Sequence, residues 1–161
     1  MKDSQLQIRI SGQQKESIKR AAAAAGMDIS SWVLDRCLNQ NRTKFHEIIK
    51  RLERSLTPTF ELAELNYFLD NLPAREFHSQ LQSLPTVKLD AELANRIAAM
   101  IEYAAEKKQA IAPEWTVKIK PLAAPVFDTD LKSLKTYLLL NSPTAFKRRN
   151  IFLDSSIGDQ V

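Results

Sequence analysis

A short run near the N-terminus alternates apolar with polar side chains, which is the period of a β-strand. Its apolar positions are Leu6, Ile8 and Ile10, and its polar positions are Gln5, Gln7, Arg9 and Ser11. A single strand cannot pair its own backbone donors and acceptors. No later segment reads as a good partner for it, so we expect the partner strand to come from a second copy of the chain.

Two helices are predicted directly after this strand. Ser11 and Gln14 form an S-x-x-Q capping box, which starts a helix near residue 12. The alanine run ends at Gly26, a residue suited to a left-handed C-terminal cap. Asp28 can then cap a second helix that continues to Leu38.

Apolar residues of the strand and helices would meet in the core of a dimer, because about 45 residues bury too little surface to fold alone. The predicted dimer core consists of Leu6, Ile8, Ile10, Ile18, Trp32 and Val33. Cys37 falls in the same apolar pattern, and we expect it to be a buried structural thiol.

A two-stranded ribbon of this size fits the major groove of DNA. Its outward face would carry Gln5, Gln7 and Arg9. Glutamine pairs with adenine and arginine with guanine, each contributing about 1–3 kcal/mol of discrimination. The alternative is an ordinary edge strand with a solvated polar face.

Phosphate contacts are expected at the start of the second helix. The free backbone N–H groups at Ile29 and Ser30 would form an anion site there. Lys15 on the first helix is a further candidate.

The order of these elements resembles the ribbon-helix-helix family, and within it the antitoxins that are paired with acetyltransferase toxins. The similarity lies in the strand and in the segments SGQQKESIKRAA, AGMDIS and SWVLDRCL. It covers roughly the first quarter of the chain. Two departures are Ser31, where many members have an acidic residue, and Trp32, where a smaller aromatic residue is usual. The resemblance implies a dimeric ribbon-helix-helix module that binds DNA.

The rest of the chain reads as helical, so the fold class is mainly α, with a small all-α domain after the N-terminal module. We expect the module at 1–42, a connecting helix at 43–56 and a helical partner-binding domain with an extended tail at 57–161. The connecting helix has an apolar stripe of Phe45, Ile48, Ile49, Leu52 and Leu56. Further helices are expected after Pro58, after Pro73 and after Asp90, which is placed to cap a long one.

The C-terminal third is interrupted by prolines. Val117 and Ile119 alternate with lysines, which predicts a short strand or an extended arm. A helix follows from Asp130 to about Asn141, with four leucines expected to face inward, namely Leu131, Leu134, Leu138 and Leu139. The tail contains Ile151, Phe152, Leu153 and Ile157, and it either packs on its own domain or is held by another protein.

Large apolar residues of the helical domain are the candidates for binding a partner protein. They are Phe60, Leu65, Phe68, Phe146, Ile151 and Phe152. From Pro113 onward the chain is also similar to C-terminal parts of small bacterial proteins encoded beside nucleotidyltransferase-like toxins. The basic cluster Lys147–Arg149 reads as a solvated helix end, with a second DNA contact as the alternative.

Charge is unevenly distributed along the chain. Residues 1–56 contain eleven Lys and Arg against six Asp and Glu, whereas the remainder is close to neutral. A positive excess beside the predicted ribbon suits DNA binding and predicts an affinity that falls with salt.

Motifs for catalysis are missing from the sequence. It has three scattered glycines and no phosphate loop, and His46 and His78 have no partners at metal-ligand spacing. The Glu61 and Glu64 pair is expected on an exposed helix face. We therefore expect no enzyme activity, no metal and no cofactor. With one cysteine and no membrane-spanning run, a cytoplasmic protein is expected.

Together these patterns predict an antitoxin of a bacterial type II toxin–antitoxin system. It would act as a homodimer on operator DNA and would neutralise a cognate toxin, either an acetyltransferase or a nucleotidyltransferase-like protein. Two alternatives remain: a ribbon-helix-helix repressor that senses a small molecule through its helical domain, and a scaffold whose ribbon only dimerises.

Overall fold

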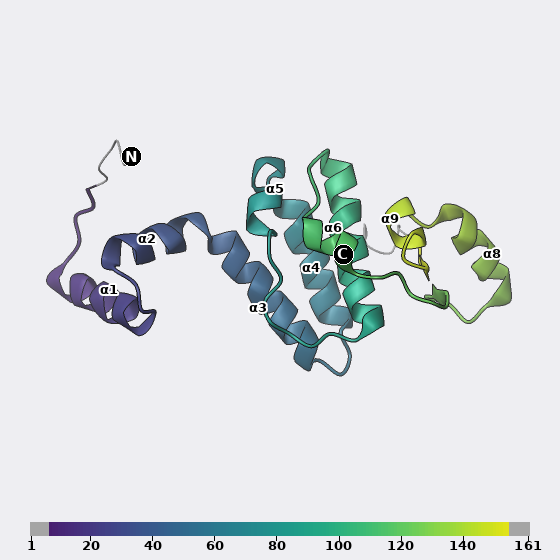
Figure 1. Cartoon of the computed structure of the whole chain (residues 1–161), viewed down its shortest axis with the longest axis horizontal. Helices are drawn as coiled ribbons and strands as arrows, with labels where there is room; N and C mark the ends of the chain where they lie inside the picture. Colours follow the sequence, from purple (N-terminus) through teal and green to yellow (C-terminus); the bar gives the residue numbers. More distant parts are fainter. Residues whose placement is uncertain (1–6, 155–161) are drawn as a thin grey trace. The chain divides into compact units, whose positions relative to one another are not determined.

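The structure, a computed structural model, describes residues 7–154. This part of the chain is mainly helical, which confirms the predicted mainly-α class (Figure 1). Contacts divide the chain into two units, Met1–Gln40 and Asn41–Val161. In the described part of the chain, every helix is too short or too polar to cross a membrane.

The first unit contains two helices, α1 at Gly12–Ala24 and α2 at Ile29–Leu38, which pack on each other. Both begin where the sequence predicts, because both starts are set by local capping side chains.

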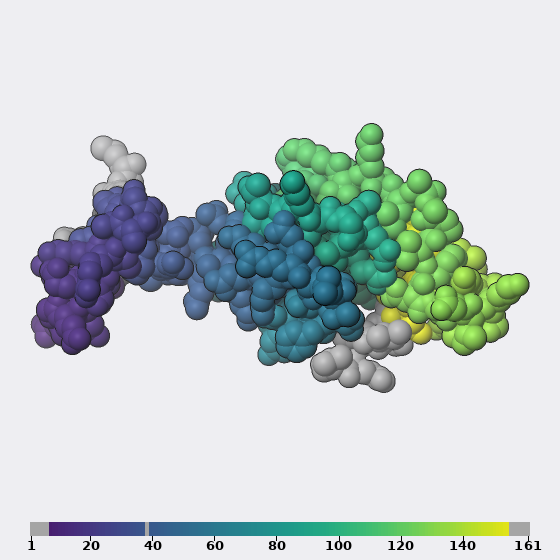
Figure 2. All heavy atoms as spheres, turned by 90° about the horizontal axis from the view of Figure 1, so that it is seen from below, coloured from purple at the N-terminus to yellow at the C-terminus, as the bar shows by residue number. Residues whose placement is uncertain are grey.

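The second unit has its main core among four helices: α3 at Gln40–Arg54, α4 at Thr59–Asn71, α5 at Ala74–Gln80 and α6 at Ala91–Lys108. The fully buried side chains include Phe45, Ile48, Ile49, Leu52, Leu65, Leu69, Leu72, Phe77, Leu81, Ile97 and Ile101. In the space-filling view these helices form a closely packed blue-to-teal body (Figure 2). The segment expected as a connecting helix, 43–56, therefore contributes four fully buried side chains to this core.

Two expectations for this region are wrong in detail. Leu56 was expected on the apolar stripe, but α3 ends at Arg54 and Leu56 is almost completely exposed in the following turn. Glu61 and Glu64 were expected to be exposed, but each has a carboxylate oxygen that is buried. The reason in both cases is the tight α3–α4 turn, which ends the helical period and brings α4 against α3.

The C-terminal part of the second unit contains three short helices and a two-stranded parallel sheet. The helices are α7 at Glu114–Lys118, α8 at Lys132–Asn141 and α9 at Thr144–Lys147. The strands are β1 at Val126–Phe127 and β2 at Ile151–Phe152, paired in register. The Phe127 and Phe152 rings stack with their centroids 4.8 Å apart.

The strand or arm expected around Val117 and Ile119 is therefore wrong. Val117 is exposed within the short helix α7, which starts directly after Pro113. Proline opens a helix readily because the first turn needs no N–H from it. The strand forms later, at Val126, where a partner strand is within reach.

The inward leucines expected on α8 are also largely wrong. Only Leu138 of the four is buried, whereas Leu131, Leu134 and Leu139 are exposed. Among the larger element contacts α8 touches β2, so one edge of the helix is covered and its other sides face solvent.

The apolar tail packs on its own unit as far as residue 154. Ile151 and Phe152 are buried, and the Ser142 hydroxyl donates to the Leu153 carbonyl at 2.8 Å while accepting the Leu153 N–H at 2.9 Å. Ile157 lies outside the described residues.

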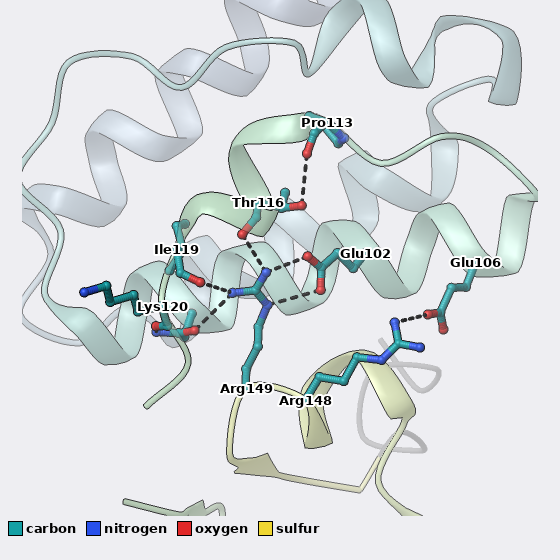
Figure 3. Close-up of polar contacts among 9 residues, drawn as sticks. Glu102, Glu106, Pro113, Thr116, Ile119, Lys120, Arg148 and Arg149 are labelled. Carbon is teal, nitrogen blue, oxygen red and sulfur yellow. Dashed lines mark hydrogen bonds and ion pairs between the residues drawn. The ribbon is translucent and has the colours of Figure 1, made fainter. Parts of the chain in front are cut away.

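A buried arginine joins the C-terminal segment to α6 and α7 (Figure 3). The Arg149 guanidinium donates to both Glu102 oxygens, at 3.1 and 2.5 Å, and to Asn95 Oδ1 at 3.1 Å. Its remaining N–H groups donate to two carbonyl oxygens, of Thr116 at 2.7 Å and of Ile119 at 3.4 Å. All five guanidinium N–H donors thus have acceptors.

The basic cluster Lys147–Arg149 is therefore neither a solvated helix end throughout nor a free cationic patch. Arg149 is only 4% exposed. Lys147 donates to the Leu140 carbonyl at 2.7 Å, and Arg148 lies 3.7 Å from a Glu106 oxygen. The expectation fails because the chain turns back at this point and carries Arg149 inward.

Two further arginines tie elements of the second unit together. Arg96 forms a two-pronged pair with Asp128 at 2.9 and 2.7 Å, and these hydrogen bonds raise the pKa of its guanidinium. Arg51 of α3 lies 2.6 Å from Glu64 of α4, and this hydrogen bond raises the pKa of Arg51.

Replacing Arg149 with methionine tests the importance of the buried network. The Glu102 carboxylate would lose its partner in a site where it is mostly shielded from water. We expect Arg149→Met to lower the free energy of unfolding of the second unit by about 3–5 kcal/mol, measured by urea denaturation and circular dichroism.

Arg148→Met is the matched control, because the Arg148 side chain is mostly exposed and its contact with Glu106 is long. An exposed pair of this kind contributes less than about 1 kcal/mol. Equal urea midpoints for the two variants would contradict the importance assigned to Arg149.

Candidate nucleic-acid interface

The predicted base-reading segment is exposed in the single chain. Residues 7–10 are not paired as a strand within the described part of the chain, and all four are exposed. Ile8 and Ile10 expose 59% and 44% of their surface. Gln7 and Arg9 are exposed as well, whereas Gln5 and Leu6 lie outside the described residues. The paired ribbon therefore stays a prediction.

The predicted start of α1 is confirmed. The Ser11 hydroxyl accepts the Gln14 N–H at 3.2 Å, and the Gln14 side chain accepts the Ser11 N–H at 2.8 Å. Each residue satisfies a donor of the other, so the junction between segment and helix is defined locally. Lys15, in the first turn of α1, is exposed.

The turn between the helices has the geometry of a Schellman cap. Met27 N–H donates to Ala22 O at 3.0 Å, and Gly26 N–H donates to Ala23 O at 3.0 Å. Gly26 has a φ of +66°, a conformation that side-chain-bearing residues rarely adopt.

The predicted cap of α2 is also confirmed. The Asp28 carboxylate accepts the Ser31 N–H at 3.0 Å. Ile29 and Ser30, the proposed phosphate contacts, are the first two residues of the helix and are exposed. Amides at this position have no intrahelical acceptor, so they point toward any anion placed before the helix.

The expected dimer core is mostly uncovered in one copy. Ile18, Trp32 and Val33 are only half-buried. Ala22 is the one buried residue among the residues of the first unit whose burial is described. The Arg36 guanidinium lies 5.7 Å from the centre of the Trp32 ring. The unit therefore has ordered local structure without an interior of its own.

Cys37 was expected to be buried, and in the single chain this is wrong. The residue lies on α2, whose apolar side has little to pack against within one copy. The apolar pattern around Cys37 in the sequence therefore does not lead to burial of its side chain within one chain.

The toxin-binding candidates separate clearly by burial. Five of them belong to the interior of the second unit: Leu65, Phe68, Phe146, Ile151 and Phe152. Phe60 alone among the six is exposed, at 74%. Since the five buried residues form the interior of the second unit, Phe60 is the candidate among the six that is accessible to a partner. Tyr67, which the sequence pattern does not single out, is 65% exposed on the same helix.

A shallow hollow of about 270 Å³ lies beside α7. It is lined by His78, Gln82, Glu114, Trp115 and Lys118. Four of these are exposed, and the Trp115 indole N–H already donates to the Leu81 carbonyl at 2.8 Å. An open polar hollow of this kind lacks the enclosed apolar lining typical of a ligand pocket. Within residues 7–154 no group of three or more His, Cys, Asp or Glu side chains is placed to hold a metal ion.

The described part of the first unit consists of an extended segment followed by two capped helices. Residues 5–67 match the model of a protein family described as Antitoxin TacA 1-like. The predicted resemblance to antitoxins is confirmed by this match, which covers the first unit from residue 5 onward, α3 and most of α4. No curated protein and no solved structure matches the chain.

Removing the α2 cap tests how far this module depends on local capping. Asp28→Ala leaves the Ser31 N–H without its acceptor, and we expect a loss of about 1 kcal/mol in the stability of the first unit. Thermal unfolding at a fixed protein concentration would show this as a lower Tm.

Glu16→Ala is the control, since Glu16 is an exposed residue of α1 that forms an exposed ion pair with Lys19. Its effect should stay within about 0.5 kcal/mol. If Asp28→Ala lowers the stability no more than Glu16→Ala does, the start of α2 is determined by packing and not by its cap.

Proposed function

We propose that this protein is the antitoxin of a bacterial type II toxin–antitoxin system, in which it represses its own operon and neutralises a cognate toxin. The first unit would dimerise and bind operator DNA in the major groove. The second unit would bind the toxin. The toxin is an acetyltransferase or a nucleotidyltransferase-like protein, and the protein itself acts without catalysis in the cytoplasm.

The observation that carries this proposal is the lack of an interior in the first unit. Its helices are well capped, yet Ala22 is its one buried residue among those described. The exposed large apolar residues there are Ile8, Ile10, Met27, Ile29 and Leu34. Apolar surface contributes about 25 cal/mol per Å² when it is removed from water, so a second copy would gain substantially by covering these residues.

Pairing two copies of the N-terminal segment would place polar side chains on the outer face of a ribbon. Gln7 and Arg9 alternate with Ile8 and Ile10 in the sequence, so the two sets would point to opposite sides once the segment forms a strand. We assign Gln5, Gln7 and Arg9 to base reading, because glutamine and arginine match the hydrogen-bonding edges of adenine and guanine. The start of α2 at Ile29 and Ser30, together with Lys15, would hold the phosphates.

The family match supports the antitoxin part of the proposal. An antitoxin implies a toxin partner, and the second unit supplies a folded body with its own core for that contact.

Disrupting the apolar side of the ribbon tests dimerisation. We expect wild-type protein to have twice the 18.3 kDa mass of one chain in light scattering, and Ile8→Asp to shift it toward the single-chain mass. A buried carboxylate without a partner is strongly unfavourable, so the dimer would weaken by several kcal/mol, on the order of 3–5.

Val117→Asp is the matched control, because Val117 is an exposed apolar residue in the second unit. It should leave the mass unchanged. A dimer that survives Ile8→Asp would exclude the ribbon as the dimer contact.

DNA binding is tested with a duplex from the region upstream of the gene, at two salt concentrations. We expect tight binding that weakens at higher salt, and an Arg9→Ala variant that binds about 10–100-fold more weakly because one base contact is lost at each half-site. A scrambled duplex should show no such dependence on Arg9.

Arg75→Ala provides the control for loss of one exposed positive charge, since Arg75 lies on α5 in the second unit. If Arg9→Ala and Arg75→Ala bind the upstream duplex equally well, the segment does not read bases. The first unit would then act only in dimerisation.

A further inference from the structure

Helix α4 is apolar on two opposite sides. One side supplies Leu65, Phe68 and Leu69 to the core of the second unit. The other side carries Phe60, Ala63 and Tyr67, all exposed, and we call these three residues the α4 outer face. An apolar face on a helix is normally covered by another element or by a partner.

The α4 outer face has the spacing of a helix that binds in a groove. Phe60 and Tyr67 are seven residues apart, so they project from nearly the same side, with Ala63 between them. They expose 74% and 65% of their surface. Exposed aromatic side chains on one helix face are the residues that most often dominate a protein–protein contact.

The exposed negative charge of α4 comes from Asp70, because Glu61 and Glu64 each have a buried carboxylate oxygen. The helix has three carboxylates, Glu61, Glu64 and Asp70, and no lysine or arginine. Glu64 is paired with Arg51 of α3, and Lys108 of α6 donates to the Asp70 carbonyl oxygen at 2.6 Å. Among the described residues the Asp70 carboxylate forms no ion pair, and it lies about one turn from Tyr67. An apolar groove with a basic edge would complement this face.

Another exposed apolar surface offers a useful comparison. Helix α8 carries exposed Leu134, Tyr137 and Leu140, but the helix has two lysines and no acidic residue. It also lies outside the region that matches the antitoxin family, whereas that region includes both Phe60 and Tyr67. The α4 outer face is therefore the better candidate for binding the toxin that an antitoxin is expected to have.

We infer that the α4 outer face is the surface that binds the toxin, and that it fits an apolar groove with a basic edge on that protein. This inference rests on the proposed antitoxin function. It assigns the main contact to Phe60 and Tyr67 and a steering contact to Asp70. The buried residues of α4 act indirectly, by holding the helix in place.

The experiment is a calorimetric titration of the full-length chain with the purified product of the adjacent gene. Four proteins are compared: wild type, the double variant Phe60→Ala with Tyr67→Ala, the α8 double variant Leu139→Ala with Leu140→Ala, and Asp70→Lys. All the substituted side chains are exposed, so circular dichroism should show unchanged melting.

We expect the α4 double variant to weaken the Kd at least about 100-fold, as loss of two aromatic anchors would. The α8 double variant should stay within about twofold of wild type. Asp70→Lys should weaken the Kd about 5–10-fold at low salt and less at high salt, because an edge contact is screened.

Failure of the inference is distinguishable from failure of the proposed function. If wild type binds and the α4 double variant binds equally well, the inference is wrong while the antitoxin function stands. If wild type does not bind the adjacent gene product, the toxin-binding function and the inference fall together. If the α4 double variant instead lowers the oligomeric state and leaves toxin binding intact, a second copy occupies the face, and the inference is overturned.

Discussion

The buried Arg149 guanidinium is the interaction on which the C-terminal half of the second unit depends. It donates to α6 through Asn95 and Glu102 and to the α7 region through the Thr116 and Ile119 carbonyls. A buried charge is tolerated only when it is paired and fully hydrogen-bonded. The C-terminal segment is therefore held where the Arg149 guanidinium reaches all its acceptors. The next residue, Asn150, takes a left-handed backbone conformation, and β2 follows beside β1. The network thus holds the apolar residues Ile151 and Phe152 in buried positions.

The first unit is stabilised in a different way. Its helices have a capping box, a Schellman turn and an aspartate cap, all formed between residues close in sequence. Such caps define where helices begin and end, but each contributes only about 1 kcal/mol. With Ala22 as the one buried side chain among the described residues of this unit, the caps do not supply the free energy of a stable domain. The second unit, in contrast, folds around a core of its own.

Burial decides which apolar residues are available to partners. The sequence offered six candidates of similar character, and five of them lie inside the second unit. Phe60 and Tyr67 stand apart because they lie on the side of α4 opposite its core residues. An amphipathic pattern alone could not separate the two sides, since both are apolar. The exposed leucines of α8 have the same origin, as that helix is covered along only one edge.

The sequence by itself determined the helical class, the resemblance to antitoxins and the helix boundaries at Ser11, Gly26, Asp28 and Asp90. The helix boundaries depend on hydrogen bonds between residues three to five positions apart, so the local sequence is enough to predict them. Only the tertiary structure decided that Arg149 is buried, that Val126 pairs with Ile151, and that Cys37 is exposed within one chain. Arg149 and Glu102 are 47 residues apart, and no local period encodes a contact at that separation. Burial is a property of what packs against a residue, and that is settled only when distant segments meet.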